Sequence, residues 1–118
     1  MKENAIKNKS KKFAIRIINL YKFLYDTQKE YVLSKQILRS GTSIGANVRE
    51  SEHAQSDLDF LHKVNIALKE ANKTQYWLEL LFETNFIGEK QFVSINNDCS
   101  EICKLLISIT KTLKFKNQ

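Results

Sequence analysis

The sequence predicts an all-α protein: an antiparallel up-down-up-down four-helix bundle formed as a single domain over residues 1–118. The chain has no proline and only three glycines, whereas hairpins and β-sandwiches need these residues for their turns. Apolar residues recur at helical spacing in four segments, which indicates four amphipathic helices. The connections between them are short, and short connections make neighbouring helices antiparallel. A three-helix bundle with a detached first helix is the weaker alternative.

The first helix is expected from about Ser10 to Tyr25, after a disordered basic arm over residues 1–9. Apolar residues lie three or four positions apart along it, as a core-facing stripe requires. The inward residues are Phe13, Ile17, Leu20 and Leu24.

The second helix is expected from Ser34, as the N-cap, to about Ala54. Gly41 and Gly45 lie one turn apart inside it. Because each interior glycine costs about 1 kcal/mol relative to alanine, we expect the backbone of a neighbouring helix to approach closely at this pair.

The third helix is expected to begin after Ser56, since Asp59 three residues later completes a capping-box-like pattern. Its apolar seam advances by three or four residues at each step. The seam consists of Phe60, Val64, Ala67, Ala71, Thr74, Leu78 and Leu81.

The fourth helix carries the most regular seam, in which steps of three and four residues alternate. Residues 114–118 are expected as a frayed basic tail. Cys99 and Cys103 lie one turn apart on this helix and are expected as reduced core thiols, with a disulfide between them as the less favoured alternative. The seam consists of Phe92, Ile95, Cys99, Ile102, Leu106, Ile109 and Leu113.

Residues 43–81, SIGANVRESEHAQSDLDFLHKVNIALKEANKTQYWLELL, resemble the 23S ribosomal RNA intervening-sequence proteins. The resemblance implies an all-α bundle, a homo-oligomer that is a pentamer, and no established enzyme activity. The related accessory proteins of diversity-generating retroelements are basic and work with a reverse transcriptase, so the resemblance also implies RNA, DNA or a reverse transcriptase as a partner. The matching features are Ser43-Ile44-Gly45-Ala46-Asn47 with Glu50, Ser56 and Phe60, then Ile66-Ala67 with Glu70, and Tyr76-Trp77-Leu78.

Basic residues gather near both ends of the chain. Residues 1–24 carry seven basic side chains and one acidic, and residues 104–118 carry four basic and none acidic. The predicted topology places both ends at one pole, and a basic patch is typical of proteins that bind polyanions. The alternative is a charged surface that only keeps the protein soluble, and charge alone favours neither. The candidate nucleic-acid-binding residues are Lys9, Lys11, Lys12, Arg16, Lys111, Lys114 and Lys116.

The first and third helices carry more apolar residues than one core face needs. Together these residues predict a patch too large for a monomer, which favours self-association. The candidate contacts between copies are Ile15, Ile18, Tyr21, Ile66 and Trp77.

The second helix also carries a polar cluster of Ser43, Asn47 and Glu50. The favoured interpretation is that hydrogen bonds from these residues fix the register of the helices. The alternative is that they contact a ligand or another protomer.

No set of residues predicts catalysis, a metal site or a cofactor, because neither His53 nor His62 has further ligands at a suitable spacing. We therefore expect a non-enzyme, and a cytoplasmic one, since no signal peptide or membrane span is evident. The leading hypothesis is a homo-oligomeric scaffold that contacts nucleic acid, or a protein that handles it, through the basic pole. The alternatives are a membrane-surface or partner-helix module built on the first helix, and a purely structural oligomer without a ligand.

Overall fold

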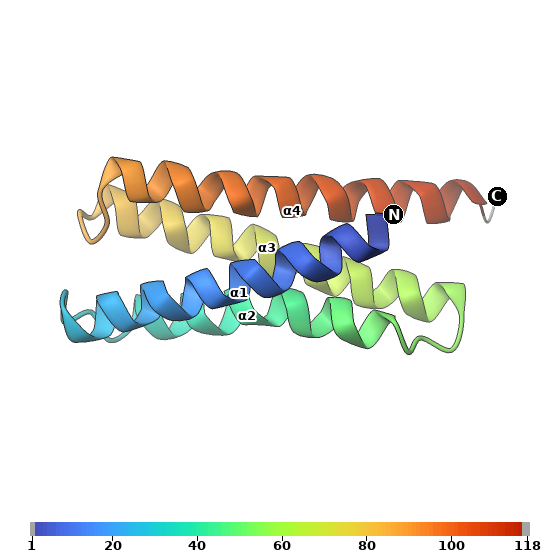
Figure 1. Ribbon diagram of the computed structural model, residues 1–118, viewed down its shortest axis with the longest axis horizontal. Helices are drawn as coiled ribbons and strands as arrows, with labels where there is room; N and C mark the ends of the chain where they lie inside the picture. Colours follow the sequence, from blue (N-terminus) through green and yellow to red (C-terminus); the bar gives the residue numbers. More distant parts are fainter. Residues whose placement is uncertain (1, 117–118) are drawn as a thin grey trace.

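The computed structural model describes the backbone of residues 2–116 and the side chains of residues 2–113. This part of the chain contains four helices and no strand, which confirms the all-α prediction. Consecutive helices run in opposite directions (Figure 1), and each packs against the next, while α1 also packs against α4. The helices are α1 (Lys2–Asp26), α2 (Leu33–Ser51), α3 (Asp57–Glu83) and α4 (Glu89–Lys116).

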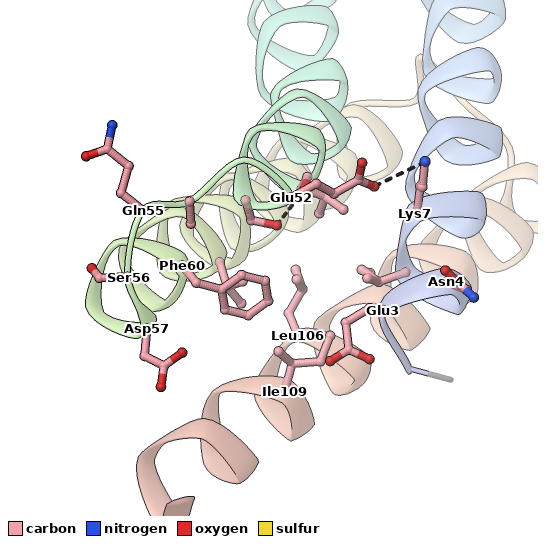
Figure 2. Close-up of a pocket in the computed structure, with 15 residues that line it drawn as sticks. Glu3, Asn4, Lys7, Glu52, Gln55, Ser56, Asp57, Phe60, Leu106 and Ile109 are labelled. Atoms are coloured by element: carbon pink, nitrogen blue, oxygen red, sulfur yellow. Dashed lines mark hydrogen bonds and ion pairs between the residues drawn. The ribbon is translucent and has the colours of Figure 1, made fainter. Parts of the chain in front are cut away.

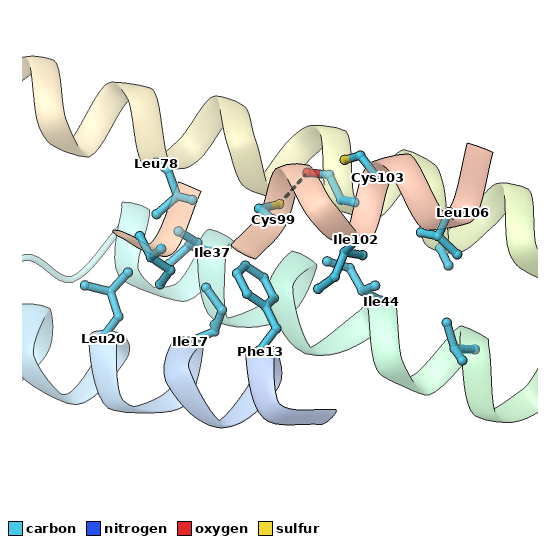
Figure 3. Close-up of a cluster of buried hydrophobic side chains, with 14 of the residues drawn as sticks. Phe13, Ile17, Leu20, Ile37, Ile44, Leu78, Cys99, Ile102, Cys103 and Leu106 are labelled. Atoms are coloured by element: carbon cyan, nitrogen blue, oxygen red, sulfur yellow. Dashed lines mark hydrogen bonds between the residues drawn. The ribbon is translucent and has the colours of Figure 1, made fainter. Parts of the chain in front are cut away.

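The predicted seams form the core between the four helices (Figure 3). Ile17, Leu78 and Leu106 are fully buried, as the spacing of apolar residues predicts. The seam residues Phe60 and Phe92 are half-buried, because each lies near the beginning of its helix. The hydrophobic effect of this one continuous core therefore holds all four helices together.

Helix α1 begins at Lys2, so the prediction of a disordered arm is wrong for residues 2–9. Ile6 is only 3% exposed and extends the core by two turns beyond Phe13. Lys2 Nζ also donates a hydrogen bond to Ser108 Oγ of α4. Tertiary contacts thus stabilise a segment whose sequence is mostly polar. At the other end of the chain, the helical backbone of α4 continues to Lys116, and the remainder of the predicted frayed tail lies outside the described residues.

The N-terminus of α2 differs from the prediction. Ser34 is not the N-cap: it lies inside the helix, is fully buried, and its hydroxyl has no hydrogen-bond partner among the described residues. Instead, the carboxylate of Glu30 accepts hydrogen bonds from the backbone N–H groups of Leu33 at 3.0 Å and Ser34 at 2.7 Å. A side chain from the preceding loop therefore caps α2.

The N-terminus of α3 agrees with the prediction. Ser56 has an extended backbone, and its Oγ accepts a hydrogen bond of 3.0 Å from the backbone N–H of Asp59. The carboxylate of Asp59 accepts in return from the backbone N–H of Gln55 at 3.2 Å. This reciprocal pair satisfies donors that a helix terminus leaves unpaired.

The expected close approach of a neighbouring backbone occurs at only one of the two glycines of α2. A Cβ atom at Gly41 would lie 2.7 Å from Cγ1 of Ile17, and one at Gly45 would lie 3.4 Å from the carbonyl oxygen of Ser10. The backbone of α1 therefore approaches α2 at Gly45, whereas at Gly41 the side chain of Ile17 fills the space beside the glycine.

Both cysteines of α4 are free and buried. The thiol of Cys99 donates to the carbonyl oxygen of Ala71 at 3.4 Å. A hydrogen bond with Cys103 and burial raise the pKa of the Cys99 thiol far above its ordinary value, so Cys99 acts as a protonated packing residue of the α3–α4 seam.

Candidate nucleic-acid interface

The two ends of the chain meet at one pole of the bundle, as predicted, because Lys2 of α1 contacts Ser108 of α4. This pole, however, contains a hollow of about 610 Å³ whose rim is acidic (Figure 2). Glu3, Glu52 and Asp57 line it, and Glu52 pairs with Lys7 at 3.2 Å. Carboxylates at the rim repel phosphate, so the pole is not a uniform site for a polyanion.

Two of the predicted basic residues form ion pairs with carboxylates of α4. Lys9 Nζ pairs with the carboxylate of Glu101 at 3.2 Å, and Arg16 Nη1 pairs with that of Asp98 at 2.6 Å. The Arg16 guanidinium also donates to Ser94 Oγ at 3.1 Å. These contacts join α1 to α4, and in each pair one carboxylate offsets one positive charge.

The other predicted basic residues are dispersed. Lys11, Lys12 and Lys111 are exposed, on two different helices. The side chains of Lys114 and Lys116 lie outside the described residues. The structure therefore describes five of the seven predicted residues, and these five do not form one uncompensated basic patch.

A groove between α1 and α2 combines one predicted residue with two that sequence reasoning missed. Its volume is about 460 Å³, and its basic lining residues are Lys7, Lys11 and Arg49. Within residues 2–113, no ion pair engages Lys11 or Arg49. The one acidic lining residue, Glu50, pairs with Lys63 of α3 at 3.1 Å.

The lining of this groove also consists of small side chains, because α1 and α2 lie close together there. Small side chains keep the groove open between its basic residues. Lysine offers a point charge, and arginine offers paired donors that match a phosphate. The small residues are Ser10, Ala14, Thr42, Gly45 and Ala46.

The predicted apolar contacts do not form one patch. Ile15 and Ile18 are exposed and Tyr21 is half-buried on α1, whereas Ile66 and Trp77 are half-buried on α3, at the opposite corner of the bundle. Trp77 also packs against the core.

Aromatic residues enlarge the exposed apolar surface that Ile15 and Ile18 form on α1. The ring centroid of Tyr25 lies 5.6 Å from that of Tyr21 and 4.7 Å from that of Tyr31 in the α1–α2 connection. With Ile15, which is 52% exposed, and Ile18, these tyrosines form an apolar surface along the outer side of α1.

The predicted polar cluster does not link helices as expected. Ser43 Oγ donates to the carbonyl oxygen of Arg39 at 2.6 Å, and Asn47 Nδ2 donates to that of Ser43 at 2.9 Å. Both bonds stay within α2, and of the three residues only Glu50 reaches α3, through its ion pair with Lys63.

Two other polar pairs link neighbouring helices. The buried hydroxyl of Thr74 lies 2.9 Å from that of Ser40, which joins α3 to α2. Gln75 Nε2 donates to Ser100 Oγ at 2.9 Å, which joins α3 to α4. Buried and half-buried polar pairs of this kind hold helices in one register. The partners in each pair lie too far apart in sequence for a local pattern to reveal them.

The side of α1 that the membrane-surface alternative requires is not free. Phe13, Ile17 and Leu24, the apolar side of the alternative membrane-surface hypothesis, are buried in the core. Within the described residues, no helix is long and apolar enough to cross a bilayer, and no three His, Cys, Asp or Glu side chains gather as metal ligands.

The sequence model of the family described as 23S rRNA-intervening sequence protein matches residues 2–108. A crystal structure of a protein with unknown function from the S23 ribosomal protein family of Bacteroides thetaiotaomicron VPI-5482 is similar to the chain. Its sequence identity is 68%, the match covers 94% of this chain and 99% of that chain, and the TM-score is 0.93. No curated protein matches the chain. The resemblance inferred from residues 43–81 is confirmed.

Proposed function

The chain belongs to the family of 23S rRNA-intervening sequence proteins, and we propose that it is a non-enzymatic, self-associating helical scaffold that binds the phosphate backbone of nucleic acid. The observation that carries the proposal is the α1–α2 groove, which Lys7, Lys11 and Arg49 line. The net charge of +6 supports it, because a basic protein attracts a polyanion from a distance.

The groove binds nucleic acid with little preference for sequence. Its cations contact phosphates, which position a nucleic acid without reading its bases. Each phosphate that Lys11 or Arg49 neutralises releases condensed counterions, and this release drives binding at low salt.

Self-association raises the overall affinity for nucleic acid when the affinity of each single groove is low. The apolar surface of Ile15, Ile18, Tyr21, Tyr25 and Tyr31 lies along α1, next to the groove but nearer the C-terminal end of that helix. If this surface is the contact between copies, several grooves face one nucleic acid at once. Linked weak contacts then bind far more tightly than each contact alone. The resemblance supports a pentamer as the assembly.

The test is binding of a fluorescently labelled nucleic acid to matched variants. We expect Lys11→Gln with Arg49→Gln to weaken binding at about 50 mM salt by roughly tenfold or more, with unchanged helicity. The control is Lys90→Gln with Lys104→Gln, which removes the same charge from exposed positions on α4. Equal losses in both double variants would show that net charge, and not the groove, attracts the ligand. Absence of binding by the unaltered protein would leave the charge as a solubility device.

A further inference from the structure

A second hollow, between α2 and α3, has a different chemistry from the α1–α2 groove. It encloses about 410 Å³ and is lined by polar side chains and one aromatic ring. Gln36, Arg39 and Asn47 of α2 lie across from Glu70, Lys73 and Trp77 of α3. We call this hollow the α2–α3 cleft.

We propose that the α2–α3 cleft binds an unpaired nucleotide of single-stranded nucleic acid, with the base against Trp77 and the phosphates at Arg39 and Lys73. This inference rests on the proposed function, that the protein binds nucleic acid, and names a second site on it with its own ligand class.

The polar groups of the cleft are available for a ligand. Among residues 2–113, no hydrogen bond or ion pair engages the Arg39 guanidinium or the side-chain amide of Gln36. Asn47 donates its amide hydrogen to the carbonyl oxygen of Ser43, which leaves its side-chain oxygen as an acceptor. Fork-shaped guanidinium donors and amide groups suit a phosphate and a base edge.

One acidic group completes the cleft without cancelling its positive charge. Glu70 has a side chain only 18% exposed and pairs with Lys73 at 3.1 Å. The formal charges of Arg39, Lys73 and Glu70 sum to +1. The carboxylate fixes the position of Lys73, and it can accept a hydrogen bond from the amino group of a base.

The aromatic part of the cleft favours a base over a phosphate alone. Trp77 is half-buried, and one part of it packs on the core while another lines the cleft. Tyr76, 54% exposed, has its ring centroid 5.3 Å from that of Trp77. Exposed Lys73 and Lys69 lie on the same side of α3, one and two turns before these rings. Aromatic rings beside a row of cations are the elements with which proteins hold single strands.

The ligand is a single strand because a base must leave its stack to reach Trp77. A cleft of this size fits one nucleotide, and the bases of a duplex keep both faces covered by their neighbours. A duplex therefore engages only the α1–α2 groove.

Trp77 is the only tryptophan in the chain, so its fluorescence reports directly on the cleft. The probes are oligo(U), oligo(dU), a short duplex, and heparin as a polyanion without bases. We expect both single strands to quench the emission of Trp77, while the duplex and heparin bind without quenching it. Tighter binding of oligo(U) would assign a contact to the 2′-hydroxyl, and equal binding would assign recognition to features that RNA and DNA share.

Two exposed residues of the cleft test the assignment. Arg39→Gln and Lys73→Gln should each weaken binding of single strands by about tenfold, while binding of heparin stays unchanged. Lys90→Gln on α4 is the matched control and should have no effect on either ligand.

Several results would overturn the inference. One is a single strand that binds without quenching Trp77; another is quenching that persists unchanged in both variants. Shielding of Trp77 from acrylamide in the free protein would show that another copy covers the cleft. In each of these cases the proposed function still holds if Lys11→Gln with Arg49→Gln abolishes binding of the duplex and of heparin. Failure of all four probes to bind would instead reject both.

Discussion

Gly41 and Gly45 occupy equivalent positions on successive turns of α2, yet they meet different surroundings. A Cβ atom at Gly41 would press on the branched carbon atoms of buried Ile17 at 2.7 and 2.8 Å. A Cβ atom at Gly45 would meet the Ser10 carbonyl oxygen at 3.4 Å, an ordinary contact. Alanine therefore has opposite consequences at the two sites, although a helix prefers alanine to glycine equally at both.

We expect Gly41→Ala to lower the free energy of unfolding by about 1–2 kcal/mol, since overpacking outweighs the gain in helix propensity. Gly45→Ala should raise it, by up to about 1 kcal/mol. Urea denaturation followed by circular dichroism measures both. In an Ile17→Ala background, which removes the two nearest carbon atoms, Gly41→Ala should be clearly less destabilising. Equal effects at the two glycines in the unaltered background would contradict the geometry.

At the scale of helices, the start of α2 depends on Glu30. Its carboxylate accepts hydrogen bonds from three successive backbone N–H groups, those of Val32, Leu33 and Ser34. We expect Glu30→Ala to lower the free energy of unfolding by about 0.5–2 kcal/mol, as loss of a helix cap does. Thermal and urea unfolding check this, with Glu79→Ala, exposed on α3, as the control. No difference between the two variants would show that water replaces the cap without cost.

The helices themselves were predictable because each seam is long and regular. Where packing repeats over several turns, as from Ile95 to Ile109, the apolar period alone identifies the buried face. The beginning of α1 was not predictable in this way, since Ile6 is its only strongly apolar residue before Phe13. That segment is helical because of contacts with distant residues such as Ser108, which local propensity does not record.

The candidate site was predictable only in part, for a related reason. The sequence identifies which residues are basic, but the partners that neutralise Lys9 and Arg16 come from α4, more than eighty residues away. Arg49 was missed because acidic residues surround it in sequence. In the structure, Glu50 forms an ion pair with Lys63, and Glu52 forms one with Lys7. Arg49 therefore has no ion-pair partner among the described residues.

At the scale of the whole molecule, the outer side of α1 predicts self-association. Light scattering coupled to size exclusion should give a multiple of the 13.8 kDa chain, and the family resemblance predicts five copies. Ile15→Glu with Ile18→Glu should shift the mass toward that of one chain, because burying a charge at an apolar contact is costly. Val93→Glu, at an exposed apolar residue of α4, should leave the mass unchanged. A monomeric mass for the unaltered protein would remove self-association from the account.

If the groove between α1 and α2 binds the phosphate backbone, the salt dependence of binding depends on the cations of that groove. The affinity for a short labelled duplex should fall steeply with salt, with a slope of log K against log salt of about −0.9 for each phosphate contacted. For each groove engaged, Lys11→Gln with Arg49→Gln should make the slope shallower by about 1.8, whereas Lys90→Gln with Lys104→Gln should preserve it. The same slope in all three proteins would show that the groove does not bind the phosphate backbone.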